Sequence, residues 1–375
     1  MYIARLFFIL FTCLLSLMAS AQSAGTLDNS TKMPKFIVDP FWPKKLPAQD
    51  LLGQVAGISV DKDNHIWIIQ RPRSLTQYEL GATLKPPASI CCKPMPPVIE
   101  FDQEGNILQA WGGPGAGYDW PKVEHGIYVD PKGNVWIAGA SRDDRMVLKF
   151  SNKGKFLLQI GTPGLKQSNN DTKNLGRPTN MILDLPANEI YVSDGYQNRR
   201  VIVFDADTGI YKRQWGAYGN KPIDGSFPNF NPQSSQFGNP VHCVRILNDG
   251  LVYVCDRAND RIQIFTKSGQ FIKQMIIDPK TRGEFPLGRI FGGSTWDIVP
   301  SEDKEQKYLF IPDGMNNEVK IVLRETGEKI GSFGRSGRMA GDFHMVHSIA
   351  IDSLGNLYTT ETDNGKRIQK FIRTQ

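Results

Sequence analysis

Apolar and polar positions alternate along the chain in short runs, and the same order of runs recurs six times. Each repeat has an apolar strand, a turn rich in Asp, Gly or Asn, a second strand, a polar loop, and two more strands joined by a tight turn. The clearest copy spans residues 125–161 and reads HGIYVD, GNVWIAGA and MVLKFSNKGKFLLQIG. Short runs rich in β-branched and aromatic residues between such turns are typical of antiparallel strands.

Six such repeats predict an all-β fold, a six-bladed β-propeller, because no single repeat can bury both of its apolar faces. The sixth repeat ends at Phe371 and Ile372 after its third strand. An isolated apolar strand at residues 35–40, KFIVDP, is expected to complete this last blade and to close the ring. An open solenoid would instead need polar capping repeats. We therefore assign residues 35–375 to one propeller.

The N-terminal segment does not follow the repeat. It has Arg5, an apolar run from Leu6 to Leu17, and Ala19-Ser20-Ala21. This order is typical of a secretory signal peptide, and the run is too short for a stable membrane span. We expect a signal peptide at 1–21, a flexible N-terminus at 22–34, and a secreted or periplasmic protein with no membrane span after cleavage. An N-terminal anchor helix is the alternative interpretation.

Charge and cysteine content add two expectations. The net charge of +6 is spread along the chain without a basic stripe, so we expect no nucleic-acid partner. A hairpin turning at residues 248–250 would place Cys243 opposite Cys255, where either a disulfide or two packed thiols would fit. The state of the adjacent pair Cys91 and Cys92 stays open.

Three of the five histidines occupy the same place in alternate repeats. His125, His242 and His347 open the first strands of repeats two, four and six. The first strand of a propeller blade is innermost, so the three imidazoles are expected to meet at the axis. The odd repeats carry the small residues Ala56-Gly57, Thr179 and Ser294 near that point. Three neutral imidazoles with an open fourth position are typical of a catalytic zinc site.

Other histidines and loops carry weaker signals. His65 and His344 lie in a turn and a loop and are expected to be ordinary surface residues. The loops between second and third strands return to the same face and carry Arg71, Tyr196 and Arg257. An arginine near a metal suits a carboxylate, and a tyrosine there can act as a base. The alternative is that these residues only cap strands and pair with Asp.

Several motifs give the chain a family resemblance. They are GQVAGISVD, HGIYVD with GNVWIAGA, IYVSDGYQNRRVIVFD, RQWG, DRANDRIQIF and HMVHSIAIDSLGNLY, which follow in this order over residues 50–371. With these motifs the chain resembles the NHL-repeat propellers, specifically the peptidyl-α-hydroxyglycine α-amidating lyases (peptidylamidoglycolate lyases).

The resemblance implies a site and a reaction. It implies zinc on His125, His242 and His347, and Tyr196 as the base. It also implies that Arg71 and Arg257 bind substrate or assist the chemistry, and that Met345 lines the site. The implied reaction splits a C-terminal α-hydroxyglycine into a peptide amide and glyoxylate.

The sequence departs from the family pattern at two site positions. The family's second, calcium-type site uses two backbone carbonyls, here of Ile58 and Ile127, and an aspartate that is Ser348 here. Losing that carboxylate weakens the case for Ca²⁺, which prefers charged oxygen ligands. The family's disulfide cysteine after the tyrosine is Gln197 here. We expect no hydroxylating partner domain, so the substrate would come from elsewhere.

Two long loops are expected on the site face. The loop at 72–97, with no helix or strand of its own, is expected to act as a lid. The segment from Tyr218 to Asn239 adds Phe227, Phe230 and Phe237 and suggests an apolar substrate tail.

Our leading hypothesis is an exported zinc lyase acting on a small-molecule or peptide substrate with a carboxylate. A propeller hydrolase of the lactonase or esterase type is one alternative. A non-catalytic NHL propeller that binds peptides or polysaccharide is the other.

Overall fold

The computed structural model describes residues 33–166, 168–225, 230–281 and 292–375. The expected signal peptide at 1–21, most of the expected flexible N-terminus, and Phe227 lie outside these ranges. Among the described residues, no helix is long and apolar enough to cross a membrane.

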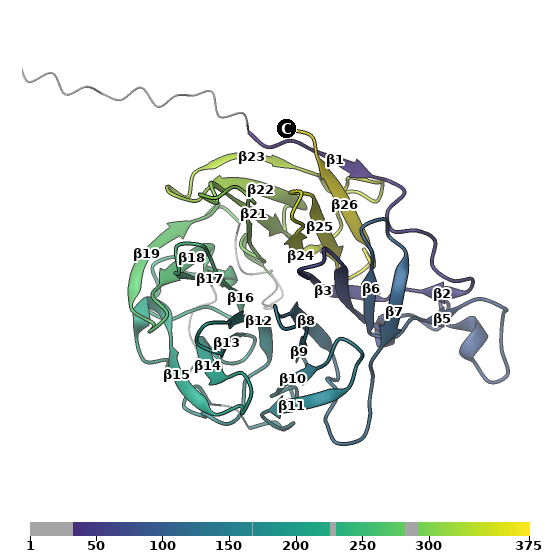
Figure 1. Ribbon diagram of the computed structural model, residues 1–375, viewed down its shortest axis with the longest axis horizontal. Helices are drawn as coiled ribbons and strands as arrows, with labels where there is room; N and C mark the ends of the chain where they lie inside the picture. The colour runs from purple at the N-terminus through teal and green to yellow at the C-terminus, as the bar shows by residue number, and fades with distance from the viewer. Residues whose placement is uncertain (1–32, 167, 226–229, 282–291) are drawn as a thin grey trace, which may run out of the picture. The chain divides into compact units, whose positions relative to one another are not determined.

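The described residues form six four-stranded antiparallel sheets arranged around a common axis (Figure 1). This confirms the predicted six-bladed propeller. The strands, from inner to outer in each blade, are β3 (Gln54–Val60), β4 (Ile66–Arg71), β6 (Val98–Phe101) and β7 (Ile107–Trp111); β8 (Glu124–Val129), β9 (Val135–Gly139), β10 (Val147–Phe150) and β11 (Phe156–Ile160); β12 (Pro178–Asp184), β13 (Glu189–Asp194), β14 (Arg200–Asp205) and β15 (Tyr211–Trp215); β16 (Val241–Ile246), β17 (Val252–Asp256), β18 (Arg261–Phe265) and β19 (Phe271–Ile276); β20 (Val299–Pro300), β21 (Tyr308–Asp313), β22 (Glu318–Leu323) and β23 (Lys329–Phe333); and β24 (Val346–Ile351), β25 (Leu357–Glu361), β26 (Ile368–Arg373) and β1 (Phe36–Asp39).

The N-terminal strand lies in the same sheet as the last three strands. β1 pairs antiparallel with β26, with Phe36 opposite Arg373 and Asp39 opposite Lys370. Apolar side chains also join the first and last blades, because Ile58 and Ile66 pack in one buried cluster with Tyr358 and Ile368. Each of the remaining pairs of neighbouring blades encloses a similar apolar cluster. The core is therefore divided among the interfaces between blades.

A recurring aspartate organises the inner hairpins. Asp130 accepts hydrogen bonds from the backbone of Asn134 (2.8 Å) and from the indole of Trp136 (3.0 Å). Asp61 does the same in blade one, with Trp67 as its indole donor (2.9 Å). One carboxylate therefore fixes both the turn and the first aromatic residue of the next strand, as an Asx turn does.

The loop at 72–97 has local structure of its own, contrary to expectation. It contains η1 (Pro72–Ser74), η2 (Gly81–Thr83) and β5 (Lys93–Pro94), and β5 pairs with β2 (Asp50–Leu51). Figure 1 shows β2, β5 and the rest of this loop at the outer side of blade one. An ion pair between Glu79 and Lys366 (2.7 Å) ties the loop to blade six.

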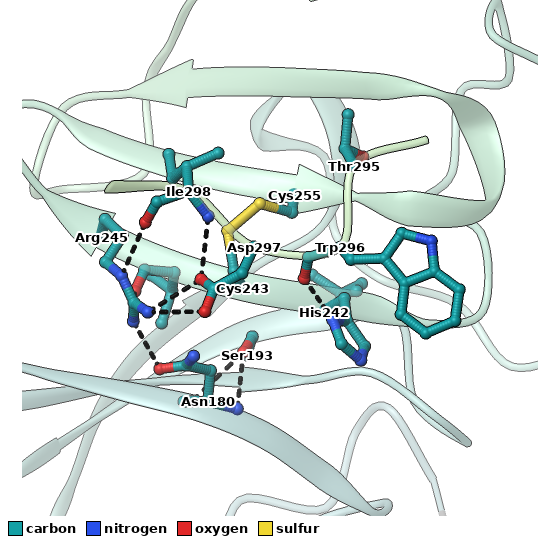
Figure 2. The surroundings of a disulfide bond; sticks show 12 residues. Asn180, Ser193, His242, Cys243, Arg245, Cys255, Thr295, Trp296, Asp297 and Ile298 are labelled. Carbon is teal, nitrogen blue, oxygen red and sulfur yellow. Dashed lines mark hydrogen bonds and ion pairs between the residues drawn. A yellow bond between two sulfur atoms is a disulfide. The ribbon is translucent and has the colours of Figure 1, made fainter. Parts of the chain in front are cut away.

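Both cysteine pairs form disulfides. The strand register places Cys243 opposite Cys255, as expected, and the two are joined by a disulfide between β16 and β17 (Figure 2). Cys91 and Cys92 form a disulfide between neighbouring residues in the loop at 72–97.

Candidate metal and substrate site

The three histidines of blades two, four and six meet at the axis. His125, His242 and His347 lie on the inner strands β8, β16 and β24, and each side chain is buried. Their ring centroids are 4.9 to 5.1 Å apart, and one nitrogen from each ring lies within 4.8 Å of the other two. The convergence expected from the repeat is therefore present.

Each imidazole is oriented by the backbone of the next blade. Nδ1 of His125 donates to the carbonyl of Thr179 (3.0 Å), and Nδ1 of His347 donates to that of Ala56 (2.7 Å). Nδ1 of His242 makes the same bond to Trp296, which Figure 2 shows. A carbonyl can only accept, so the proton is on Nδ1 and Nε2 carries a lone pair that can bind a metal.

Burial keeps these rings neutral. It lowers the pKa of all three imidazoles well below the usual value, with further lowering by Arg71 at His125 and by Arg257 at His242. Three neutral imidazoles with converging Nε2 atoms fit a zinc ion with an open fourth position. Mg²⁺ and Ca²⁺ prefer oxygen donors such as carboxylates, and this cluster of three histidines contains none.

Blade five differs from the expected pattern. The residue equivalent to Ala56 and Thr179 is Trp296, whose carbonyl bonds His242, and the small residue Ser294 lies two positions earlier. The indole of Trp296 packs against His242 and His347, with centroids 5.8 and 5.5 Å apart. The sequence carries a signal for this position, because aligning TWDIVP with PTNMIL pairs Trp296 with Thr179. The strand pattern there is weak, since β20 has only two residues.

Tyr196 lies directly at the imidazole cluster. Its hydroxyl oxygen is 3.1 Å from Nε2 of His125 and 3.2 Å from Nε2 of His242. The turn that carries it follows β13 and is held by the buried ion pair of Asp194 with Arg200 (2.8 Å). The ion pair at the end of β13 therefore helps to fix the position of the Tyr196 hydroxyl.

Arg257 is the other buried group at the cluster. It follows β17, in a turn held by the ion pair of Asp256 with Arg261 (2.7 Å). Its guanidinium is 0% exposed, stacks over the Trp296 ring at 4.1 Å, and reaches the Tyr196 oxygen at 3.5 Å. Nε and one terminal nitrogen have no hydrogen-bond partner. A buried, incompletely bonded cation of this kind favours binding of an anion.

Arg71 and Met345 also line the site. Arg71 ends β4 and donates to the Glu124 carbonyl and to the Gln54 amide oxygen, both at 2.7 Å. Met345 precedes β24 with a positive φ of 56°, an uncommon conformation for a residue with a side chain.

A cavity of about 680 Å³ adjoins the histidine cluster at His347. It brings together the predicted residues Arg71, Tyr196, Arg257, Met345 and His347. It is large enough for a small molecule or the end of a peptide. The remaining lining residues are Gln54, Val123, Ala140, Ser141, Arg177, Trp296, Thr362 and Asp363.

Two sequence expectations about the cavity wall are wrong. No residue of the loop at 72–97 lines the cavity, so the structure gives that loop no lid position. Phe237 is buried in the core between blades three and four, and neither it nor Phe230 lines the cavity. In their place, Arg177 and Trp296 are wall residues that the sequence analysis did not single out.

An ion pair lies next to the histidine cluster, because Asp297 lines the same small cavity as the three histidines. Asp297 accepts two hydrogen bonds from Arg245 (2.8 and 3.0 Å), as Figure 2 shows. It accepts a third from the Ser348 hydroxyl (2.6 Å). The carboxylate of Asp297, next to Ser348, is therefore already paired with the guanidinium of Arg245.

Known proteins resemble the chain over most of its length. No family model matches it. It is 31% identical over 332 residues to peptidyl-glycine alpha-amidating monooxygenase B of Xenopus laevis, covering 85% of this chain and 34% of that protein. It is 27% identical over 271 residues to peptidyl-alpha-hydroxyglycine alpha-amidating lyase 1 of Drosophila melanogaster, covering 68% and 46%. NHL repeat-containing protein 3 of Mus musculus is 25% identical over 357 residues, covering 90% and 84%.

A solved structure titled "Streptogramin B lyase structure" shares the fold, with a TM-score of 0.52 and 14% identity over 90% of this chain and 98% of that one. The chain spans about a third of the length of the first amidating monooxygenase that it matches.

The fold and the site together define a six-bladed propeller with a three-histidine centre on its axis. The chain is an NHL-repeat propeller homologous to the peptidyl-α-hydroxyglycine α-amidating lyases and to the amidating monooxygenases.

Proposed function

We propose that this protein is a zinc-dependent lyase that splits N-acyl or peptidyl α-hydroxyglycine into an amide and glyoxylate. The observation that carries the proposal is the Tyr196 hydroxyl, 3.1 and 3.2 Å from two imidazole nitrogens, on the wall of a cavity that also contains Arg71 and Arg257. A base, a metal-binding cluster and carboxylate-binding groups therefore face one space. The names of the relatives support the same reaction class.

The reaction needs cleavage of one C–N bond and two proton transfers, one to the base and one to the leaving nitrogen. Tyr196 removes the proton of the substrate's hydroxyl group, the C–O bond becomes the carbonyl of glyoxylate, and the C–N bond breaks. The departing amide nitrogen takes up a proton, which the Tyr196 hydroxyl can return, so atoms and charge balance. No covalent enzyme intermediate is required.

The arginines hold the substrate in place for this step. Arg71 is fixed by two neutral acceptors and Arg257 is fixed by stacking on Trp296, so both guanidinium groups are oriented before substrate enters. A planar guanidinium can bind the α-carboxylate with two parallel hydrogen bonds. Preorganised groups of this kind lower the entropic cost of reaching the reactive geometry.

His125, His242 and His347 would hold the zinc, which supplies Lewis-acid polarisation of a substrate oxygen when it is bound. The protein's contribution there is to keep the three rings neutral and to fix their orientation through the backbone carbonyls of blades one, three and five.

We also propose that residues 1–21 are a signal peptide and that the mature protein acts in the periplasm or outside the cell. The basic start, apolar run and A-x-A site support this, as does the Cys243–Cys255 disulfide, since disulfides persist in oxidising compartments.

Glyoxylate release from α-hydroxyhippurate tests the reaction. The lyase predicts stoichiometric glyoxylate and benzamide. Turnover of esters or lactones without glyoxylate would favour the hydrolase. A metal-free protein with no turnover of either substrate would favour a binding propeller.

A further inference from the structure

The substrate cavity contains a third guanidinium group, that of Arg177. The residue lies between Gly176 and β12, and its φ of 63° is in the left-handed region, which is uncommon for a non-glycine residue. Its Nε donates to the Ala140 carbonyl (2.6 Å), and its own carbonyl accepts from the backbone of Tyr196 (3.2 Å). The side chain thus lines the cavity from a segment that is hydrogen-bonded to the turn carrying Tyr196.

All three guanidinium groups are held by neutral partners. Arg71 bonds a carbonyl and an amide, Arg177 bonds a carbonyl, and Arg257 contacts the Tyr196 oxygen and aromatic rings. Within the described ranges none of the three forms an ion pair. Burial lowers the pKa of each guanidinium, while the carboxylates of Glu124 at Arg71 and of Asp144 at Arg177 act weakly in the opposite direction.

Two acidic residues near the cavity already bond other side chains. Asp363, the one carboxylate among the lining residues, bonds His344 (3.0 Å). Glu124 pairs with Arg73 (2.9 Å) and bonds the Trp120 indole (2.8 Å). The α-carboxylate of the proposed substrate carries a single charge, so it leaves part of this positive charge uncompensated.

Arg177 is close enough to the reacting groups to contact the same small substrate. Its guanidinium carbon is 5.0 Å from the centroid of the Tyr196 ring, and that of Arg257 is 5.7 Å from the same centroid. Two anionic groups a few bonds apart in one molecule could therefore reach both arginines while the hydroxyl group faces Tyr196.

We propose that the natural substrate is a dianion, an N-acyl or peptidyl α-hydroxyglycine whose acyl part carries a second carboxylate, and that Arg177 binds this second carboxylate. The inference rests on the proposed lyase function and specifies its substrate class. Arg177 acts as a specificity residue, whereas Arg71 and Arg257 bind the α-carboxylate common to all such substrates.

Two isosteric substrates test this inference. N-succinyl-α-hydroxyglycine carries a terminal carboxylate, and N-succinamoyl-α-hydroxyglycine carries a neutral amide in its place. We expect the wild-type kcat/KM for glyoxylate release to be at least tenfold higher for the succinyl compound. Arg177→Gln should remove most of this ratio, and Arg177→Lys should keep part of it. Arg142→Gln, which removes an exposed arginine that does not line the cavity, should keep the ratio.

A wild-type ratio near one would overturn the inference, as would an equal loss on both substrates in Arg177→Gln. If wild type releases glyoxylate from neither compound, the lyase proposal fails. Calorimetry with N-succinylglycine and N-succinamoylglycine then decides the dianion inference by itself. Tighter binding of the first, lost in Arg177→Gln, supports it, and equal binding overturns it.

Discussion

The hydroxyl oxygen of Tyr196 lies 3.1 Å from Nε2 of His125, although the two residues come from different blades. His125 opens the inner strand of blade two, and Tyr196 stands in the turn after the second strand of blade three. This contact places a proton acceptor beside the metal-binding nitrogens, and the proposed chemistry depends on it.

Replacing Tyr196 by phenylalanine should remove the base and leave the metal-binding cluster in place. We expect kcat for glyoxylate release to fall about 10²- to 10⁴-fold, the usual contribution of general acid–base catalysis. Zinc content should stay at the wild-type level because the three imidazoles are unchanged. Steady-state kinetics with parallel metal analysis checks both points, and a loss below fivefold would exclude Tyr196 as the base.

Arg257→Met should stabilise the fold and weaken substrate binding. The guanidinium is fully buried with two nitrogens that lack partners, so its removal should raise the free energy of unfolding by about 1–3 kcal/mol. Substrate binding should weaken, since the carboxylate loses an oriented partner. Urea unfolding and kcat/KM measured on the same variant test this. A less stable variant with unchanged KM would contradict the interpretation.

The pair of Arg245 and Asp297 next to the histidines should behave as a buried ion pair. Arg245→Met leaves Asp297 as an uncompensated buried charge and should cost about 3–5 kcal/mol in unfolding free energy. Adding Asp297→Asn removes the unpaired charge and should recover a large part of the lost unfolding free energy. If the double variant is as unstable as the single one, the pair is not coupled in this way.

Asp260 should give a pH-dependent contribution to stability. Burial raises the pKa of its carboxyl from 3.8 to about 8. Between these values the native state keeps a proton that the unfolded state has released, so the unfolding free energy falls as pH rises from about 4 to 8. Asp260→Asn removes this term and suits the left-handed φ of 52°.

The Asp260→Asn variant should therefore be more stable than wild type at pH 8, and the difference should shrink toward zero near pH 4. Urea unfolding of both proteins at the two pH values measures it. A difference of the same size at both would show that Asp260 titrates normally.

The fold and the axial cluster were predictable for one reason. A repeat with a fixed strand order makes equivalent positions meet, so the spacing of His125, His242 and His347 specifies both the ring and the centre. Tyr196 and Arg257 followed because loops after the second strands return to the same face.

The rest of the site depends on features that the repeat does not specify. Blade five has an inner strand of only two residues, and its axial position is held by Trp296 and not by Ser294. Arg177 faces the cavity through a left-handed backbone conformation just before a proline, which its sequence does not indicate. The loop at 72–97 packs beside blade one because β5 pairs with β2, a contact between segments far apart in the sequence.

The account depends most directly on the three histidines holding a metal that the reaction needs. Metal analysis of wild type and His242→Ala, combined with glyoxylate release from α-hydroxyhippurate, measures this. We expect about one zinc per wild-type chain and, in a folded variant, loss of both zinc and activity. Full activity in a folded variant that contains no metal would contradict the account.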